Sequence, residues 1–203
     1  PRSESGAFHQ LLADMRRCKD RRTCPELTTR ALYFEPNQAT RGAWAERSRY
    51  LGEIDRRVMF VCESPSNWPG RGESVEPYPC FYSSYRDKRF QVIREEFGFG
   101  DCYITNSVKC GPRRDDAHSA DEARACRGFL LREIELVKPK VVVAVGGHSK
   151  EIVLRFVLPY AKSSPKFFKV SHYSRRVGDE EMLEIWRPQF KELTDILEYH
   201  GWL

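Results

Sequence analysis

Hydrophobic positions along the chain follow two patterns, one typical of helices and one typical of buried strands. Apolar residues spaced three and four apart predict amphipathic helices, while short unbroken apolar runs predict strands that are covered on both faces. The predicted helices cover residues 6–17, 84–97, 119–137, 149–156 and 179–198. The predicted strands cover residues 57–62, 102–106, 141–145 and 167–171.

Strands alternate with helices through most of the chain, which is the pattern of a parallel sheet with helices on both faces. We therefore predict an α/β fold, a single-domain α/β/α sandwich with a central four-stranded parallel sheet. A length of 203 residues suits one such domain over residues 1–203. In folds of this kind ligands bind outside the carboxyl ends of the strands. The residues found there in this chain are Glu63, Asn106, Gly146 and His172.

The composition predicts a soluble globular protein with an anionic partner. Hydrophobic residues make up 40% and charged residues 31% of the chain. No apolar run approaches the roughly 18 residues that span a bilayer, and the first residues show no hydrophobic signal segment, so we expect a cytoplasmic protein that binds no membrane. The net charge of +5, carried mostly by Arg, favours phosphate contacts but leaves the partner open.

The seven cysteines argue against a disulfide framework, because their number is odd and the chain shows no export signal. Three lie in apolar or aromatic surroundings and are predicted to be small buried hydrophobic residues: Cys62, Cys80 and Cys102. Four remain as candidate ligands: Cys18, Cys24, Cys110 and Cys126. Spacing alone leaves an iron–sulfur cluster, a structural zinc ion and inert thiols as comparable alternatives.

Three segments together carry a family resemblance. In the stretch 103–112, Asn106 ends a strand and Lys109-Cys110 follows it, and Cys126 comes one helical segment later. This stretch resembles the uracil-DNA glycosylase superfamily, in particular its iron–sulfur family 4. The segment 62–66 resembles the Gly-Glu-Ala-Pro-Gly motif of that family, and the segment 172–174 resembles its His-Pro-Ser motif. The resemblance covers roughly residues 57–176, and the two N-terminal cysteines extend it.

The chain also departs from the family pattern. Cys62 and Ser66 replace the two glycines of the first motif, and Tyr173 replaces the proline after the histidine. Cys18 and Cys24 are separated by five residues, where family 4 usually has two. The substitutions lie around the expected pocket, so they bear on base preference more than on fold or reaction class.

The resemblance implies a monofunctional DNA glycosylase of base excision repair, which hydrolyses the N-glycosidic bond of uracil in DNA and leaves an abasic site. Glu63 would position or deprotonate the attacking water and stabilise the cationic sugar. His172 would donate a hydrogen bond to O2 of the departing base. With no lysine marked as a nucleophile, we expect hydrolysis without a Schiff base.

The resemblance also assigns the binding residues. Asn106 would read the N3–H and O4 edge of uracil, and Phe81 would stack on the base. Ser64 and Ser66 would complete the base-binding segment. Three residues after the fourth predicted strand would contact DNA: Ser174, Arg175 and Arg176.

The cofactor implied by the resemblance is a [4Fe–4S] cluster on the four candidate cysteines, with a structural zinc ion as the alternative. The N-terminal helix and cysteine loop 6–25 would complete this site. The expected partner is uracil-containing DNA, single- or double-stranded, bound by a monomer associated with the nucleoid. Two other functions stay open: a glycosylase for hypoxanthine or xanthine, and a non-catalytic iron–sulfur protein that binds nucleic acid.

Overall fold

Four strands form one parallel sheet in the order β2-β1-β3-β4. The computed structural model describes residues 4–18, 55–64, 85–109, 119–173 and 176–203. The strands are β1 (Asp55–Cys62), β2 (Cys102–Asn106), β3 (Val141–Val145) and β4 (Lys166–Val170). The predicted parallel four-stranded sheet is confirmed, with strand bounds that differ by at most two residues from those expected.

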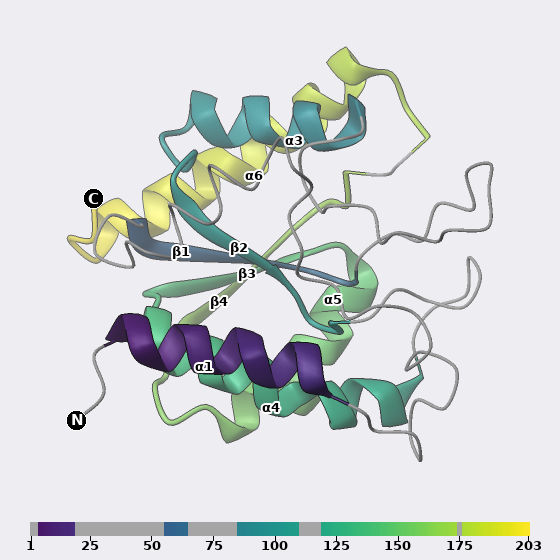
Figure 1. The fold of residues 1–203 in the computed structure, drawn as a ribbon. Coiled ribbons are helices and arrows are strands. Elements are labelled where there is room, and N and C mark those ends of the chain that lie inside the picture. The colour runs from purple at the N-terminus through teal and green to yellow at the C-terminus, as the bar shows by residue number, and fades with distance from the viewer. Residues whose placement is uncertain (1–3, 19–54, 65–84, 110–118, 174–175) are drawn as a thin grey trace.

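Helices cover both faces of this sheet, so the predicted α/β/α layering is also confirmed (Figure 1). On one face lie α1 (Glu4–Arg17) and α4 (Ala120–Val137). On the other lie α3 (Tyr85–Glu96) and α6 (Asp179–Tyr199). None of the helices in the described part of the chain is long and apolar enough to cross a membrane.

Alternation along the strands divides the core into two halves, because successive side chains of a strand point to opposite faces. Met59 and Val61 of β1 pack in the half that α1 and α4 cover. Their neighbours Val58 and Phe60 pack in the half that α3 and α6 cover, where the Phe60 ring stacks on Phe190 at 5.9 Å between centroids. The second half of β1 and all of β3 are therefore apolar and buried on both faces, as predicted, whereas the edge strand β4 exposes Lys166 and Lys169.

Helix α4 begins and ends at signals that the sequence carries. Ser119 and Glu122 form the predicted capping box, in which each side chain accepts a hydrogen bond from the other residue's backbone N–H. At the other end Lys138 adopts a left-handed conformation with φ of 53°, and Pro139 follows it. These signals explain why the predicted bounds of this helix match the observed ones.

The helix predicted over 149–156 differs from the structure. The chain forms a short α5 (Gly147–Ile152), then a π-helical segment η2 (Val153–Val157) and a 3₁₀ turn η3 (Leu158–Tyr160). Hydrophobic spacing does not separate these forms, because α and π turns both bring side chains four or five apart onto one face.

Candidate active site at the carboxyl edge of the sheet

The carboxyl ends of the four strands carry the four positions that the sequence singled out, three of them polar. Cys62 pairs with Asn106 across β1 and β2, so Glu63 directly follows the register position of Asn106. Val145 pairs with Val170 across β3 and β4, which brings Gly146 beside the segment that leads to His172. The structure therefore gathers residues from distant parts of the sequence along one edge of the sheet.

Glu63 is held through its backbone by the segment after β2. The Ser107 hydroxyl donates a hydrogen bond of 2.7 Å to the Glu63 carbonyl, and the backbone N–H of Val108 donates another of 2.9 Å. The backbone N–H of Ser107 donates to the carbonyl of Cys62 at 2.7 Å. These bonds fix the peptide of Glu63, while Glu63 and the following Ser64 stay half-buried. The backbone of Glu63 is thus fixed, while its side chain is not fully buried.

Asn106 is the last residue of β2 and is only 3% exposed. Its backbone carbonyl accepts a hydrogen bond of 2.5 Å from the Lys109 ammonium, three residues further along the chain. This bond closes the turn after the strand and holds the Asn106 peptide in one orientation. An amide group so placed offers one donor and one acceptor to a ligand.

His172 approaches the end of β3 because Gly146 has no side chain. Gly146 adopts φ of +96°, and a Cβ built there would lie 2.8 Å from the Cδ2 atom of His172. Neighbouring strands lie about 4.8 Å apart, so β2 and β4 are separated by roughly 14 Å in a flat sheet. The contact with Gly146 moves the imidazole from its own strand toward the middle of this edge. It lies there on the Tyr173 ring, with 4.4 Å between ring centroids.

The residues on both sides of His172 are bound to helices. Gln189 of α6 accepts a hydrogen bond from the Ser171 N–H at 2.7 Å and donates one to its hydroxyl at 3.0 Å. Trp186 donates to the Ser171 carbonyl at 2.9 Å. After the histidine, the Arg89 guanidinium of α3 donates to the Tyr173 carbonyl. The backbone on each side of His172 is therefore held by hydrogen bonds, at Ser171 by α6 and at Tyr173 by α3.

Arg89 reaches further along the same loop. It is 5% exposed and donates to the Val177 carbonyl at 3.1 Å and to the Asp179 carboxylate at 3.2 Å. One buried guanidinium thus binds the segment between β4 and α6 at three residues. The sequence did not reveal this role, because the partners lie more than 80 residues away along the chain.

A buried ion pair lies directly behind Asn106. Lys109 and Glu133 are 1% and 0% exposed, and their charged atoms are 2.5 Å apart. The hydroxyls of Tyr103 and Thr105 donate to the same carboxylate at 3.0 and 2.8 Å. This cluster was not identified from the sequence either, although one signal was present: Glu133 interrupts the apolar, buried face of α4.

Two of the four candidate metal ligands lie in the described part of the chain. Cys18 follows α1 and is half-buried, and Cys126 is a buried residue of α4. Burial raises the pKa of the Cys126 thiol, and the nearby Cys18 adds to that rise, whereas a hydrogen bond with the Lys109 backbone lowers the pKa. The Cys126 thiol therefore lies beside the segment that follows β2, within electrostatic range of Cys18. Within the described residues no set of three or more metal-ligating side chains comes together.

Several predicted site residues lie outside the described residues, namely Ser66, Phe81, Ser174, Arg175, Cys24 and Cys110. Their roles stay predictions, as does the burial of Cys80, which also lies outside. Arg176 is described and is exposed after β4. Cys62 and Cys102 are buried, as the sequence predicted.

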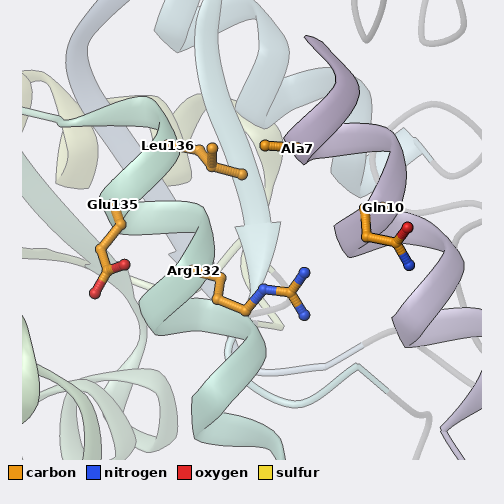
Figure 2. A pocket seen from close by; sticks show the side chains of 5 residues that line it. All are labelled: Ala7, Gln10, Arg132, Glu135 and Leu136. Carbon is orange, nitrogen blue, oxygen red and sulfur yellow. The ribbon is translucent and has the colours of Figure 1, made fainter. Parts of the chain in front are cut away.

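A pocket of about 330 Å³ lies between α1 and α4, away from this edge. Its lining residues are Ala7, Gln10, Arg132, Glu135 and Leu136 (Figure 2). Only residues 138–140 separate the end of α4 from the first residue of β3, so this end of the helix lies at the amino ends of the strands. The pocket and the candidate active site are therefore at opposite edges of the sheet.

Comparison with known proteins gives one family and several relatives. Residues 49–191 match the model of the uracil DNA glycosylase superfamily. The chain is 29% identical over 145 residues to a type-4 uracil-DNA glycosylase of Sulfurisphaera tokodaii, covering 70% of this chain and 58% of that protein. It is 35% identical over 96 residues to a type-4 uracil-DNA glycosylase of Thermotoga maritima, covering 47% of each protein. The chain thus spans about half the length of these relatives.

A third relative and a solved structure cover more of their own lengths. A type-4 uracil-DNA glycosylase of Archaeoglobus fulgidus is 25% identical over 152 residues, which is 70% of this chain and 73% of that protein. The crystal structure of wild-type SMUG2 of Pedobacter heparinus superimposes with a TM-score of 0.54 at 12% identity, covering 82% of this chain and 88% of the other. At that identity the superposition supports the fold alone.

Proposed function

This chain belongs to the uracil DNA glycosylase superfamily, and on that basis we propose that it is a monofunctional uracil-DNA glycosylase. It would hydrolyse the N-glycosidic bond of uracil in DNA and leave an abasic site during base excision repair. The observation that carries the proposal is the gathering of Glu63, Asn106 and His172 at one edge of the sheet. The relatives named type-4 uracil-DNA glycosylase support the same reaction.

In this proposal Glu63 acts on the sugar side of the scissile bond. Its carboxylate orients or deprotonates the attacking water and stabilises the oxocarbenium-like sugar. Ser107 and Val108 hold the Glu63 peptide by hydrogen bonds. The side chain therefore extends toward the reacting atoms from a backbone that is fixed in place. Such positioning contributes to the rate by removing orientational freedom before the reaction.

His172 acts on the departing base. As the bond breaks, negative charge develops on uracil, and a hydrogen-bond donor at its O2 atom stabilises that charge. The anchoring of Ser171 and Tyr173 supports this role, because a preorganised donor need not reorient during the reaction. No lysine nucleophile is needed, and Lys109 beside the site is unsuited to that role, since its ammonium is buried and bound to Glu133.

Asn106 reads the N3–H and O4 edge of the extruded base, and Phe81 stacks on its face. Ser64 and Ser66 complete the base-binding segment after β1. Ser174, Arg175 and Arg176 contact the DNA backbone or the gap left by the extruded nucleotide. The partner is uracil-containing DNA in single- or double-stranded form.

A [4Fe–4S] cluster on Cys18, Cys24, Cys110 and Cys126 completes the proposal, with a structural zinc ion as the alternative. The two described thiols, Cys18 and Cys126, fit such a group because they lie within electrostatic range of each other and because the Lys109 backbone forms a hydrogen bond with Cys126. Bound there, the group would supply structural cross-linking between the N-terminal segment and α4. We also propose that residues 1–203 act as one monomeric domain in the cytoplasm, associated with the nucleoid.

The test is base release from oligonucleotides that carry a single uracil, hypoxanthine or xanthine, followed by alkali-induced strand scission. We expect release of uracil by the wild-type protein and its loss in the Glu63→Gln variant, with DNA affinity nearly unchanged. The Glu151→Gln variant is the control, because this carboxylate lies exposed on α5, and it should keep full activity.

Two other outcomes would replace the proposal. Release of a purine alone would keep the reaction class and move the choice of base to Ser66 and Tyr173. Binding that depends on salt, without release of any base, would identify a non-catalytic nucleic-acid-binding protein.

A further inference from the structure

The Lys109–Glu133 ion pair lies beside the candidate active site, next to Asn106. Both side chains are almost completely buried, and their charged atoms are 2.5 Å apart. Removing two charges from water costs so much that a buried pair is often no more stabilising than apolar residues of the same size. Stability by itself is therefore a poor explanation for a pair at this position.

The hydrogen bonds of the ammonium suggest another role. Its three protons match three acceptors: Glu133 Oε2, Thr105 Oγ1 at 2.9 Å and the Asn106 carbonyl at 2.5 Å. Glu133 belongs to α4, whose buried face is packed against the sheet. Lys109 therefore connects Glu133 of the packed helix α4 to the backbone carbonyl of Asn106 at the end of β2.

We propose that Lys109, held by Glu133, is a positioning residue for base recognition. Its ammonium fixes the peptide of Asn106, and the direction of a side chain follows from the orientation of its own backbone. The amide of Asn106 is thereby aimed in one direction before the base arrives. This inference rests on the proposed role of Asn106 in reading uracil.

Glu133 also has a plainly structural task, since it accepts hydrogen bonds from the Tyr103 and Thr105 hydroxyls. Two variants separate the tasks. Glu133→Gln keeps the bond from Lys109 to Asn106 but leaves a buried ammonium without its counter-charge, so the protein should be less stable. The double variant Lys109→Met/Glu133→Gln removes both charges and keeps an acceptor oxygen for the hydroxyls, but it loses the bond to Asn106.

The experiment uses the full chain and measures urea unfolding, kcat and KM on a uracil oligonucleotide, and inhibition by free uracil. The double variant should be more stable than Glu133→Gln and yet show about tenfold weaker inhibition by uracil, with a higher KM and a smaller change in kcat. Glu133→Gln should stay within about twofold of wild type in uracil inhibition. Tyr103→Phe is the matched control, expected to lower stability and leave uracil inhibition unchanged.

Uracil inhibition that follows stability through all the variants would overturn the inference, as would a double variant that equals wild type. If Glu133→Gln does not fold, the comparison of wild type, double variant and Tyr103→Phe still decides. A wild-type protein that neither releases uracil nor is inhibited by it would overturn the proposed function and this inference together. A wild type inhibited by uracil whose Asn106→Ala variant is inhibited equally would overturn the base-reading role on which Lys109 acts.

Discussion

Gly146 illustrates how the absence of one side chain places another group in the candidate active site. Its φ of +96° is a conformation that residues with a Cβ rarely adopt, and the His172 ring occupies the space that a Cβ would need. At Gly147, the next residue, a Cβ would meet no atom within 4 Å. A side chain at position 146 would therefore displace the His172 ring, whereas a side chain at position 147 would displace nothing.

We expect Gly146→Ala to lower kcat for uracil release by about a hundredfold, because displacing a reacting group by about 1 Å has an effect of that size. Gly147→Ala is the control and should retain wild-type activity. Circular dichroism and urea unfolding would check that both variants fold. Wild-type kcat in a folded Gly146→Ala protein would contradict the placement of His172 in the reaction.

Two arginines connect α3 with α6 and with the loop that precedes α6. Arg89 is buried and binds the carbonyls of Tyr173 and Val177. Arg187 is half exposed and pairs with Glu96 on the surface. Hydrogen bonds from a buried guanidinium contribute more to stability than an exposed ion pair does.

Arg89→Met should therefore destabilise the protein by about 1–3 kcal/mol, because it removes the charged donor of the hydrogen bonds to Tyr173 and Val177. It should also lower kcat, because the loop that follows His172 loses its anchor. Urea unfolding and uracil-release kinetics would measure both effects. Arg187→Met serves as the control with little change in either, and equal effects of the two variants would contradict the anchoring role of Arg89.

Across the molecule as a whole, the proposed cluster would join the N-terminal segment to the sheet. Cys18 follows α1 and Cys126 belongs to α4, and these two helices lie on the same face of the sheet. Cys102 is also buried, but it lies in the other half of the core. The chain thus offers a ligand candidate and a matched cysteine that is not one.

Cys126→Ser should abolish the visible absorbance and the bound iron of the purified protein and lower its stability, because metal binding contributes directly to folding. Cys102→Ala should keep iron and absorbance. The measurement is metal content per chain, with an absorption spectrum of protein prepared without oxygen. A colourless wild type that carries zinc would favour the zinc alternative, and one that carries no metal would contradict both.

Most of the fold could be predicted from the sequence, because its signals are local. The short apolar runs that alternate with helical segments predicted a parallel sheet, and the capping box at Ser119 predicted where α4 begins. The strand-ending positions Glu63, Asn106 and His172 could also be identified, since parallel strands bring their carboxyl ends to one edge. The π-helical segment after α5 could not be predicted, because hydrophobic spacing is similar in α and π turns.

The order of residues alone therefore specifies the strands, the long helices, their layering and the edge of the sheet that carries the polar residues. The side chains that hold those residues in place are evident only in the folded chain. Arg89 with Tyr173, Lys109 with Glu133, and Gly146 with His172 are contacts between segments remote from one another in the chain. Local periodicity carries no information about such contacts, because they depend on how the helices pack on the sheet and on which polar groups that packing buries together.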